Sequence, residues 1–405
     1  MIQTQAGKVS HTMLTLDEAL ELCRKEPVPR VLTETLPIEA AVGRVLPEAV
    51  SSPIDSPPFD KATMDGYAVF EEALQPQTSL QVQATIVAGQ GEIPADLAAS
   101  GTCVRIMTGA PVPAGAVQVI RREYVREEDS SITITTPETG RNIVGRGAHL
   151  QAGQTVLQPK VLTPADSAIL AGLGLTTVTV ARSPRIALIT TGSELASPGQ
   201  NLMPGQIHDS NGTLLSALIR ETRCPLCRHL SVSDDPESIQ AAISDALAHA
   251  DVLLVTGGVS AGDFDHVPEA LAQAGVETIF HRMAFKPGKP LLFGRRESQH
   301  VFALPGNPQA VFALWTLFVR PYILRRQGIV VPERIVSLLA RETIPHTDPS
   351  RSEMVLLALN GGQVEPVPSV GSSHLEALAH AEAWAIIPAQ AGDIAAGERV
   401  DARLL

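Results

Sequence analysis

The stretch that decides the fold is Thr256-Gly257-Gly258-Val259-Ser260-Ala261-Gly262-Asp263-Phe264-Asp265-His266, which follows the largely apolar segment 251–255. This order is typical of a buried strand that ends in a glycine-rich turn. Glycines allow backbone N–H groups to turn inward and cradle an anion. Carboxylates just beyond them can hold a hard cation such as Mg²⁺. The stretch therefore indicates either a phosphate site beside a cation site or a surface turn with a solvated acidic tip.

The composition indicates a soluble cytoplasmic protein of several domains. Its 405 residues exceed one ordinary domain. With 31 Lys and Arg against 43 Asp and Glu, the net charge of −12 argues against a nucleic-acid partner. No apolar run reaches the roughly 18 residues of a membrane span, and residues 1–15 do not resemble a signal peptide. Cys224 and Cys227 form a single CxxC, which indicates a redox pair or two linker thiols rather than a zinc ribbon.

The first half of the chain alternates between helical and strand-like segments. Thr15 and Glu18 form a capping box, which predicts a helix that ends before Pro27. The pattern predicts a second helix at 38–46. Short strand-like runs separated by turn residues then predict a small β domain at 51–145. Residues 146–182 return to helix signals, so we expect them to pack with residues 1–50 and the β domain to be inserted between.

From residue 183 to residue 328, strands alternate with helices, which predicts a doubly wound, mostly parallel sheet. In such sheets, ligands bind outside the carboxyl ends of the strands. Loops after Thr190, Val255 and Leu304 should therefore share one edge. The carboxylates expected there are Glu194, Asp263 and Asp265. The glycines at which a ligand could come close to the backbone there are Gly257, Gly258 and Gly306. The cations expected at this edge are Lys286 and Lys289.

This set of residues favours a metal-assisted phosphate site over a purely structural rim. No sequence of the form GxxxxGK[ST] occurs in the loops, which disfavours a P-loop nucleoside triphosphatase. A long apolar helix is expected at 309–326, bent at Pro321. Residues 329–405 predict a small β domain, in which Gly371-Ser372-Ser373-His374 is expected to cap a helix that runs through Ala383.

Taken together, these stretches resemble the molybdopterin molybdenumtransferase family, which comprises the MoeA proteins and the E domain of gephyrin. The matching segments are FDKATMDGYAV at 59–69, RIMTGAPVP at 105–113, TTGSEL at 190–195, GQIHDSN at 205–211, TGGVSAGDFD at 256–265, KPGKP at 286–290 and LPGNP at 304–308.

The resemblance implies an α/β multidomain architecture. Its parts are an elongated N-terminal domain (1–50 plus 146–182), an inserted small β domain (51–145), a doubly wound molybdopterin-binding α/β domain (183–328) and a C-terminal β domain (329–405). Family members are homodimers, in which the cleft lies between the α/β domain of one subunit and the β domain of the other. A molybdopterin adenylyltransferase is a further partner that the resemblance suggests.

The resemblance also implies a Mg²⁺-dependent transferase of molybdenum cofactor biosynthesis. Molybdenum from molybdate is inserted into adenylylated molybdopterin, with release of AMP. The catalytic residues would be Asp60, Thr108, Glu194, Asp263, Asp265, Lys286 and Lys289, and the metal ligands would be Asp265, Asp263 and Glu194. The pterin-binding residues would be Gly257, Gly258, Ser260, Gly262, Gly288, Gly306, Asn307, Arg351 and Ser373.

The chain departs from the family pattern at a few positions. Lys61-Ala62 stand where the family usually has Asn-Ser, Gly147-Ala148-His149-Leu150 replace Gly-Glu-Asp-Ile, and Gln309-Ala310 replace Val-Ser. Two alternative functions stay open. One is a molybdopterin adenylyltransferase, which Val259-Ser260 disfavour because that family resembles GGTG followed by Arg-Asp. The other is a non-catalytic scaffold that binds the pterin or partner enzymes.

Overall fold

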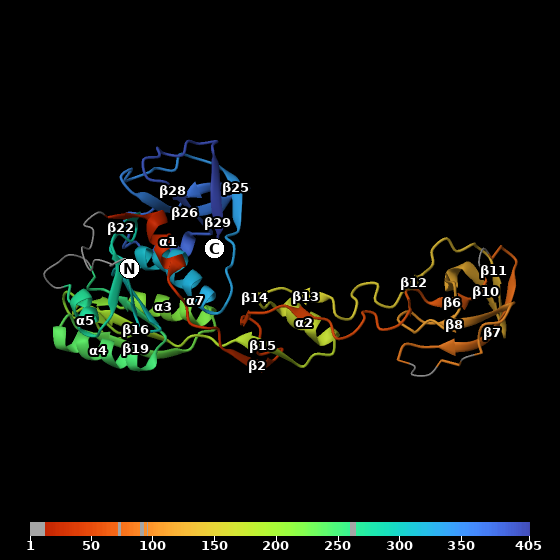
Figure 1. The fold of residues 1–405 in the computed structure, drawn as a ribbon. Coiled ribbons are helices and arrows are strands. Elements are labelled where there is room, and N and C mark those ends of the chain that lie inside the picture. Colours follow the sequence, from red (N-terminus) through yellow and green to blue (C-terminus); the bar gives the residue numbers. More distant parts are fainter. Residues whose placement is uncertain (1–12, 72–73, 90–92, 95, 260–264) are drawn as a thin grey trace, which may run out of the picture. The chain divides into compact units, whose positions relative to one another are not determined.

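The computed structural model describes residues 13–71, 74–89, 93–94, 96–259 and 265–405 (Figure 1). The chain divides into two compact units. The first comprises Met1–Pro47, Lys160–Pro164 and Thr177–Leu405, and the second comprises Glu48–Pro159 and Ala165–Thr176. The finer division into four domains stays a prediction.

A six-stranded sheet forms the centre of the first unit. Its order is β19 (Leu226–Val232), β16 (Ile186–Thr191), β20 (Val252–Thr256), β24 (Gln299–Leu304), β23 (Leu292–Arg296) and β21 (Glu277–His281). The first four strands are parallel to one another, and β23 pairs antiparallel with both of its neighbours, β24 and β21. Thr190 pairs with Thr256, and Thr256 pairs with Leu304, so these three strands end level with one another.

Alternate residues of the central strands enter two different cores, as the period of a strand requires. Leu188, Leu254 and Phe302 pack with α3 (Ser210–Glu221), α6 (Pro308–Leu314) and α7 (Arg320–Arg326). Ile189 and Val255 pack instead with α4 (Pro236–His249) and α5 (Val267–Gln273). Helices therefore cover both faces, which confirms the predicted doubly wound architecture. Within the described residues, no helix is long and apolar enough to span a lipid bilayer.

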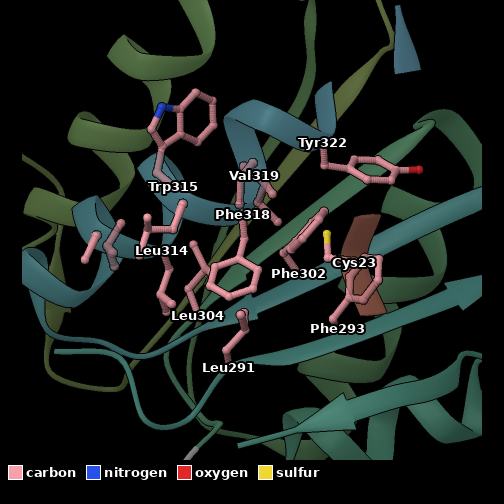
Figure 2. Packing of buried hydrophobic residues seen from close by; sticks show 14 of the residues in the cluster. Cys23, Leu291, Phe293, Phe302, Leu304, Leu314, Trp315, Phe318, Val319 and Tyr322 are labelled. Atoms are coloured by element: carbon pink, nitrogen blue, oxygen red, sulfur yellow. The ribbon is translucent and has the colours of Figure 1, made fainter. Parts of the chain in front are cut away.

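Helix α1 (Leu16–Lys25) begins at the predicted capping box and joins the first of these cores. Its buried face presents Leu16, Ala19 and Cys23. Figure 2 shows Cys23 beside Phe293 and Phe302, with Phe318 in the same cluster. Helix α1 is thus part of the core of the α/β sheet.

A second, seven-stranded sheet contains the C-terminal part of the chain. Its order is β1 (Leu14–Thr15), β22 (Met283–Lys286), β26 (Ser352–Asn360), β27 (Gln363–Pro366), β25 (Ile335–Ala340), β29 (Arg399–Leu404) and β28 (Ala383–Ile387). An additional pairing of β26 with β28 closes the last five strands into a small barrel. Strand β22 pairs in parallel with β26, with Phe285 opposite Ser352 and Lys286 opposite Glu353. This pairing joins the barrel to the α/β domain.

The second unit contains another six-stranded sheet. Its order is β10 (Val125–Glu128), β11 (Ser131–Ile134), β7 (Ser79–Ile86), β8 (Thr102–Ile106), β6 (Gly66–Val69) and β9 (Gln118–Arg121). A 3₁₀ turn, Arg122–Tyr124, follows β9. Helix α2 (Pro164–Gly172) lies in the segment 146–182, where the sequence indicated helix.

Short two-stranded pairings complete the fold. They are β2 (Thr33–Pro37) with β15 (Thr177–Ala181), β3 (Val45–Leu46) with β14 (Lys160–Val161), β4 (Val50–Ser51) with β13 (Thr155–Leu157), β5 (Lys61–Ala62) with β12 (Ile143–Val144), and β17 (Leu195–Ala196) with β18 (Ile207–His208).

Three expected helices differ in the structure. The helix expected at 38–46 is absent from this described segment, because Gly43 N donates to Leu162 O at 2.8 Å and β3 pairs with β14. The long helix contains a π-helical segment, Trp315–Val319, just before Pro321; Arg320 N donates to Trp315 O, five residues back. The helix expected to run through Ala383 is only α8 (Glu376–His380), since Ala383 already begins strand β28.

A buried polar group links α1, β24 and α7. His300, only 2% exposed, lies with Nδ1 2.5 Å from the Tyr322 hydroxyl and Nε2 3.3 Å from Glu26 Oε1. Arg295 also donates to Glu26, at 3.1 Å. A neutral imidazole with its proton on Nε2 satisfies both contacts, because it accepts from the tyrosine and donates to the carboxylate. Burial lowers the pKa of His300, and the nearby Arg325 and Arg326 add to this effect.

This pKa shift predicts an acid-sensitive contribution to stability. Below pH of about 6.5 the unfolded chain binds a proton at His300 that the folded chain binds only at lower pH. Stability should therefore be lost as the pH falls from about 6.5 through the folded pKa, with a slope of up to about 1.4 kcal/mol per pH unit. Urea denaturation of the wild type and of His300→Phe between pH 7 and 5, at intervals of about half a unit, measures the difference.

The matched control for this experiment is His380→Phe, because His380 is exposed on α8. The control should keep the wild-type pH dependence. Equal slopes for the wild type and His300→Phe would contradict the prediction.

Candidate functional site

A cleft of about 950 Å³ lies in the first unit, at the carboxyl ends of β16, β20 and β24. The loops after these three strands line it, as the sequence predicted from their order. Further walls come from residues 286–290, which follow β22, and from Arg351, Ser372, Ser373 and Leu375 of the C-terminal part. Both sheets of the first unit therefore contribute to the same cleft.

The structure brings most of the predicted site residues into this cleft. Those that line it are Glu194, Gly257, Gly258, Asp265, Lys286, Gly288, Lys289, Gly306, Asn307, Arg351 and Ser373. Ser260, Gly262 and Asp263 lie outside the described residues. Asp60 and Thr108 belong to the second unit, so their contribution to the cleft stays a prediction.

The backbone of Gly257 and Gly258 packs directly against Thr191, the last residue of β16. Their φ angles are +98° and +62°, in the left-handed region that favours glycine. A Cβ atom at Gly257 would lie 2.3 Å from Thr191 O, and one at Gly258 would lie 2.9 Å from Val267 Cγ2. Thr191 Oγ1, buried beside this loop, has no hydrogen-bond partner among the described residues. The Gly257 N–H already donates to Leu304 O at 3.1 Å, so the close backbone approach that suits an oxyanion is at Gly258.

Asn211, at the start of α3, holds two of the cleft loops together. Its Nδ2 donates to Gly306 O at 2.7 Å and to Thr256 Oγ1 at 3.3 Å. The Thr256 hydroxyl in turn donates to Pro305 O at 3.0 Å. The beginning of α3 is itself fixed by Asp209, whose carboxylate accepts from Gly212 N at 2.8 Å. These bonds hold the loops after β20 and β24 in one arrangement before a ligand binds.

The cations of the cleft differ in their availability. Lys286 Nζ lies 3.1 Å from Glu353 Oε1, a pair whose side chains are 34% and 9% exposed, and it also contacts the Thr347 hydroxyl. Arg351 pairs with Asp348, and hydrogen bonds from Ser350 and Arg351 lower the pKa of Asp348 to about 2. Lys289 is exposed and forms no ion pair with a described carboxylate. Lys289 therefore offers the least compensated positive charge of the three.

Sequence reasoning missed an acidic residue, Asp234, which lines the cleft from the loop after β19. Its Oδ2 accepts from Ser193 N at 3.0 Å, and its own N–H donates to Ser193 Oγ at 3.2 Å. The position of Asp234 directly after a strand could have indicated this, because β19 is parallel to β16 and its carboxyl end must reach the same edge. Asp234 and Asp209 join Glu194 and Asp265, so carboxylates outnumber cations in the lining.

The donor set fits a hard divalent cation that binds together with a phosphorylated ligand. Among the residues that the structure describes, no three Asp, Glu, His or Cys side chains gather closely enough to hold a metal by themselves. Mg²⁺ does not need such a cage, because it usually binds one or two carboxylates, several waters and the substrate phosphates. Glu194 and Asp265 place two carboxylates on the lining, which are the groups that would hold such an ion.

In the second unit, Asp60 and Thr108 each have a local structural partner. Asp60 Oδ1 accepts from Arg146 N at 2.7 Å. The backbone N–H and the hydroxyl of Thr108 both donate to Asp65 Oδ1 at 2.7 Å, and these bonds lower the pKa of Asp65. Thr108 thus joins its loop to the distant Asp65, and its hydroxyl oxygen is left to accept from a ligand.

Comparison with known families covers most of the chain. Residues 14–174 match the MoeA N-terminal region (domain I and II), residues 187–325 match a probable molybdopterin binding domain, and residues 343–405 match the MoeA C-terminal region (domain IV).

Curated relatives match over nearly their full length. A molybdopterin molybdenumtransferase of Nostoc sp. is 36% identical over 386 residues, which cover 91% of this chain and 88% of the relative. The protein of the same name from Haemophilus influenzae is 32% identical over 401 residues, covering 96% of this chain and 98% of the relative. The crystal structure of a molybdopterin biosynthesis MoeA protein from Pyrococcus horikoshii superposes with a TM-score of 0.83 at 29% identity, covering 97% of this chain and 100% of that one.

The close packing of Gly257 against β16 predicts a strict requirement for glycine. Gly257→Ala should lower the free energy of unfolding by about 2 kcal/mol or more, because the left-handed backbone is strained and the new methyl group meets Thr191 O. Thermal and urea denaturation of the purified variant measure this loss.

Gly306→Ala is the matched control, since a Cβ there meets no atom within 4 Å. Its stability should stay within about 0.5 kcal/mol of the wild type. The interpretation fails if both alanine variants are equally stable.

Proposed function

Because the chain belongs to the molybdopterin molybdenumtransferase family, we propose that the cleft of the first unit is its active site. The protein is a transferase of molybdenum cofactor biosynthesis that inserts molybdenum into molybdopterin. The finer proposal is that it takes molybdate and adenylylated molybdopterin, and that water attacks the phosphoric anhydride, so that AMP leaves and the pterin keeps its phosphate. Molybdate then exchanges one oxide, released as water with the two thiol protons, for the two sulfurs of the pterin. Molybdenum is then held by the dithiolene sulfurs of the pterin.

One observation carries the metal dependence: the cleft has glycine-rich backbone for an anion but an excess of carboxylates around it. Lys286 and Arg351 are already compensated by Glu353 and Asp348. A phosphorylated substrate and molybdate, both anions, would be repelled by this lining without a further positive charge. We therefore propose that Mg²⁺ binds with the substrate, held by Asp265 and Glu194, with Asp263 as a third ligand.

Each group of the cleft has a proposed role. The backbone N–H of Gly258 binds the phosphate of the pterin, since the N–H of Gly257 already donates to Leu304 O at 3.1 Å. Lys289 offsets the charge of the incoming oxyanion. When bound, Mg²⁺ polarises the phosphoryl oxygens and neutralises the charge that develops on the departing AMP. Asn211 keeps the loops in place, so that the reacting bond is held in one orientation.

The reaction is tested with purified protein, adenylylated molybdopterin, molybdate and Mg²⁺. We expect release of AMP that a chelator stops and added Mg²⁺ restores. Asp265→Ala should reduce the rate by a factor of about 100 or more while the thermal unfolding temperature stays close to that of the wild type. Turnover of Asp265→Ala at the wild-type rate would refute the metal assignment. Tight pterin binding without AMP release from the wild type would favour a non-catalytic scaffold.

We further propose that the protein is a cytoplasmic homodimer, with Asp60 and Thr108 of one subunit completing the cleft of the other. All four cysteines are free thiols, which suits a reducing compartment. The distance in sequence between these motifs and the cleft supports a shared site. A molybdopterin adenylyltransferase is the expected supplier of the substrate, because direct transfer would protect the anhydride from water.

Mixing two inactive variants tests the shared site. If Asp60 acts in the partner's cleft, a heterodimer of Asp60→Ala with Asp265→Ala contains one cleft without a substitution. Random reassociation of the two variants should then restore about a quarter of the wild-type activity. Activity that stays at the level of the separate variants, or a monomeric mass in solution by light scattering, would contradict this arrangement.

A further inference from the structure

The loop 369–374, here termed the serine loop, connects β27 to α8 and brings Ser372 and Ser373 into the wall of the cleft. Most of its residues are exposed, and Val370 is 93% exposed. Within the loop, His374 N donates to Gly371 O at 3.0 Å, and Ser369 Oγ donates to the same carbonyl at 3.1 Å. Two longer bonds, both of 3.4 Å, join Val370 N to His374 Nδ1 and Gly371 N to Ser369 Oγ. The loop therefore depends on contacts from outside for a fixed position.

Those contacts come from the first turn of α6. The Gln309 side-chain nitrogen donates to Ser369 Oγ at 2.8 Å, to His374 O at 2.8 Å and to Gly371 O at 3.1 Å. The backbone N–H of Gln309 donates to Ser372 O at 3.1 Å. This N–H is one of the helix-start donors that have no partner within the helix. Gln309 thus contacts four residues of the serine loop.

A neighbouring contact fixes the orientation of one hydroxyl group. Asn307 Nδ2 donates to Ser372 Oγ at 2.9 Å. Because the oxygen accepts this bond, the hydroxyl proton of Ser372 is directed away from Asn307 and can be donated to another acceptor. Ser372 lines the cleft, where the phosphate or molybdate would supply that acceptor.

We propose that Gln309 is a positioning residue that holds the serine loop against the cleft, so that the Ser372 hydroxyl donates to the oxyanion of the substrate. The proposal rests on the proposed function for the identity of that oxyanion. Gln309 itself does not contact the substrate; it acts through the loop. Its amide nitrogen is the group that matters, because all three side-chain contacts use it as the donor.

The test uses the full-length protein and the substitution Gln309→Glu, which preserves the size of the side chain and removes its donors. Hydrogen–deuterium exchange of peptides covering 369–374 should become about 10-fold faster. The KM for adenylylated molybdopterin should rise by about 10-fold while kcat changes by less than about 2-fold, since the lost contact is to the bound ground state. Gln309→Lys, whose ammonium group can donate to the same oxygens, should restore most of the protection and of the KM.

Gln83→Glu is the matched control, because Gln83 is an exposed residue of β7 in the second unit. It should change neither exchange of the serine loop nor KM. Unchanged exchange in Gln309→Glu, or faster exchange with an unchanged KM, would overturn the proposal. If the wild type released no AMP, the proposed function would be wrong, while the exchange rates would still decide whether Gln309 holds the loop.

Discussion

The parallel register of β16, β20 and β24 is the constraint on which the rest of the first unit depends. Thr190, Thr256 and Leu304 lie in one row across the sheet, so the chain leaves all three strands at the same edge. The alternation of side chains along the same strands creates two apolar faces, each of which requires helices. Those helices return the chain to the opposite edge before the next strand begins. The cleft is therefore a consequence of how the strands pair, and the side chains in its loops adapt it to a particular ligand.

The net charge that the cleft presents to a ligand depends on carboxylates that do not line it but pair with its cations. Glu353 and Asp348 compensate two of the three cations that the sequence places there. A half-buried lysine without its carboxylate would lose much of its stabilisation in that position. The pairing of Lys286 with Glu353 thus holds β22 against β26 and also reduces the positive charge available to a ligand. One ion pair therefore serves the architecture and reduces the positive charge that the cleft offers to an anionic ligand.

Patterns confined to one segment were predictable from the sequence, whereas features that depend on distant partners were not. The capping box of Thr15 and Glu18, the alternation of strands and helices after residue 183, and the common edge of three loops all followed from local rules. Residues 38–46 appeared helical because their pairing with residues 160–162 is not visible in their own sequence. The compensation of Lys286 by Glu353 and the contacts of Gln309 likewise join residues about 60 positions apart. Asp234 was predictable in principle, since its strand is parallel to β16.

Strand β22 belongs to the α/β segment of the chain, yet it pairs with the first residues of β26 in the C-terminal barrel. The α/β segment therefore depends on the barrel to pair one of its own strands. A chain that ended before residue 335 would expose the backbone N–H and C=O groups of β22, next to the buried Met283 and Phe285. Such an open, apolar edge is a template for pairing between molecules. The C-terminal part thus covers a strand that would otherwise be open, in addition to forming one wall of the cleft.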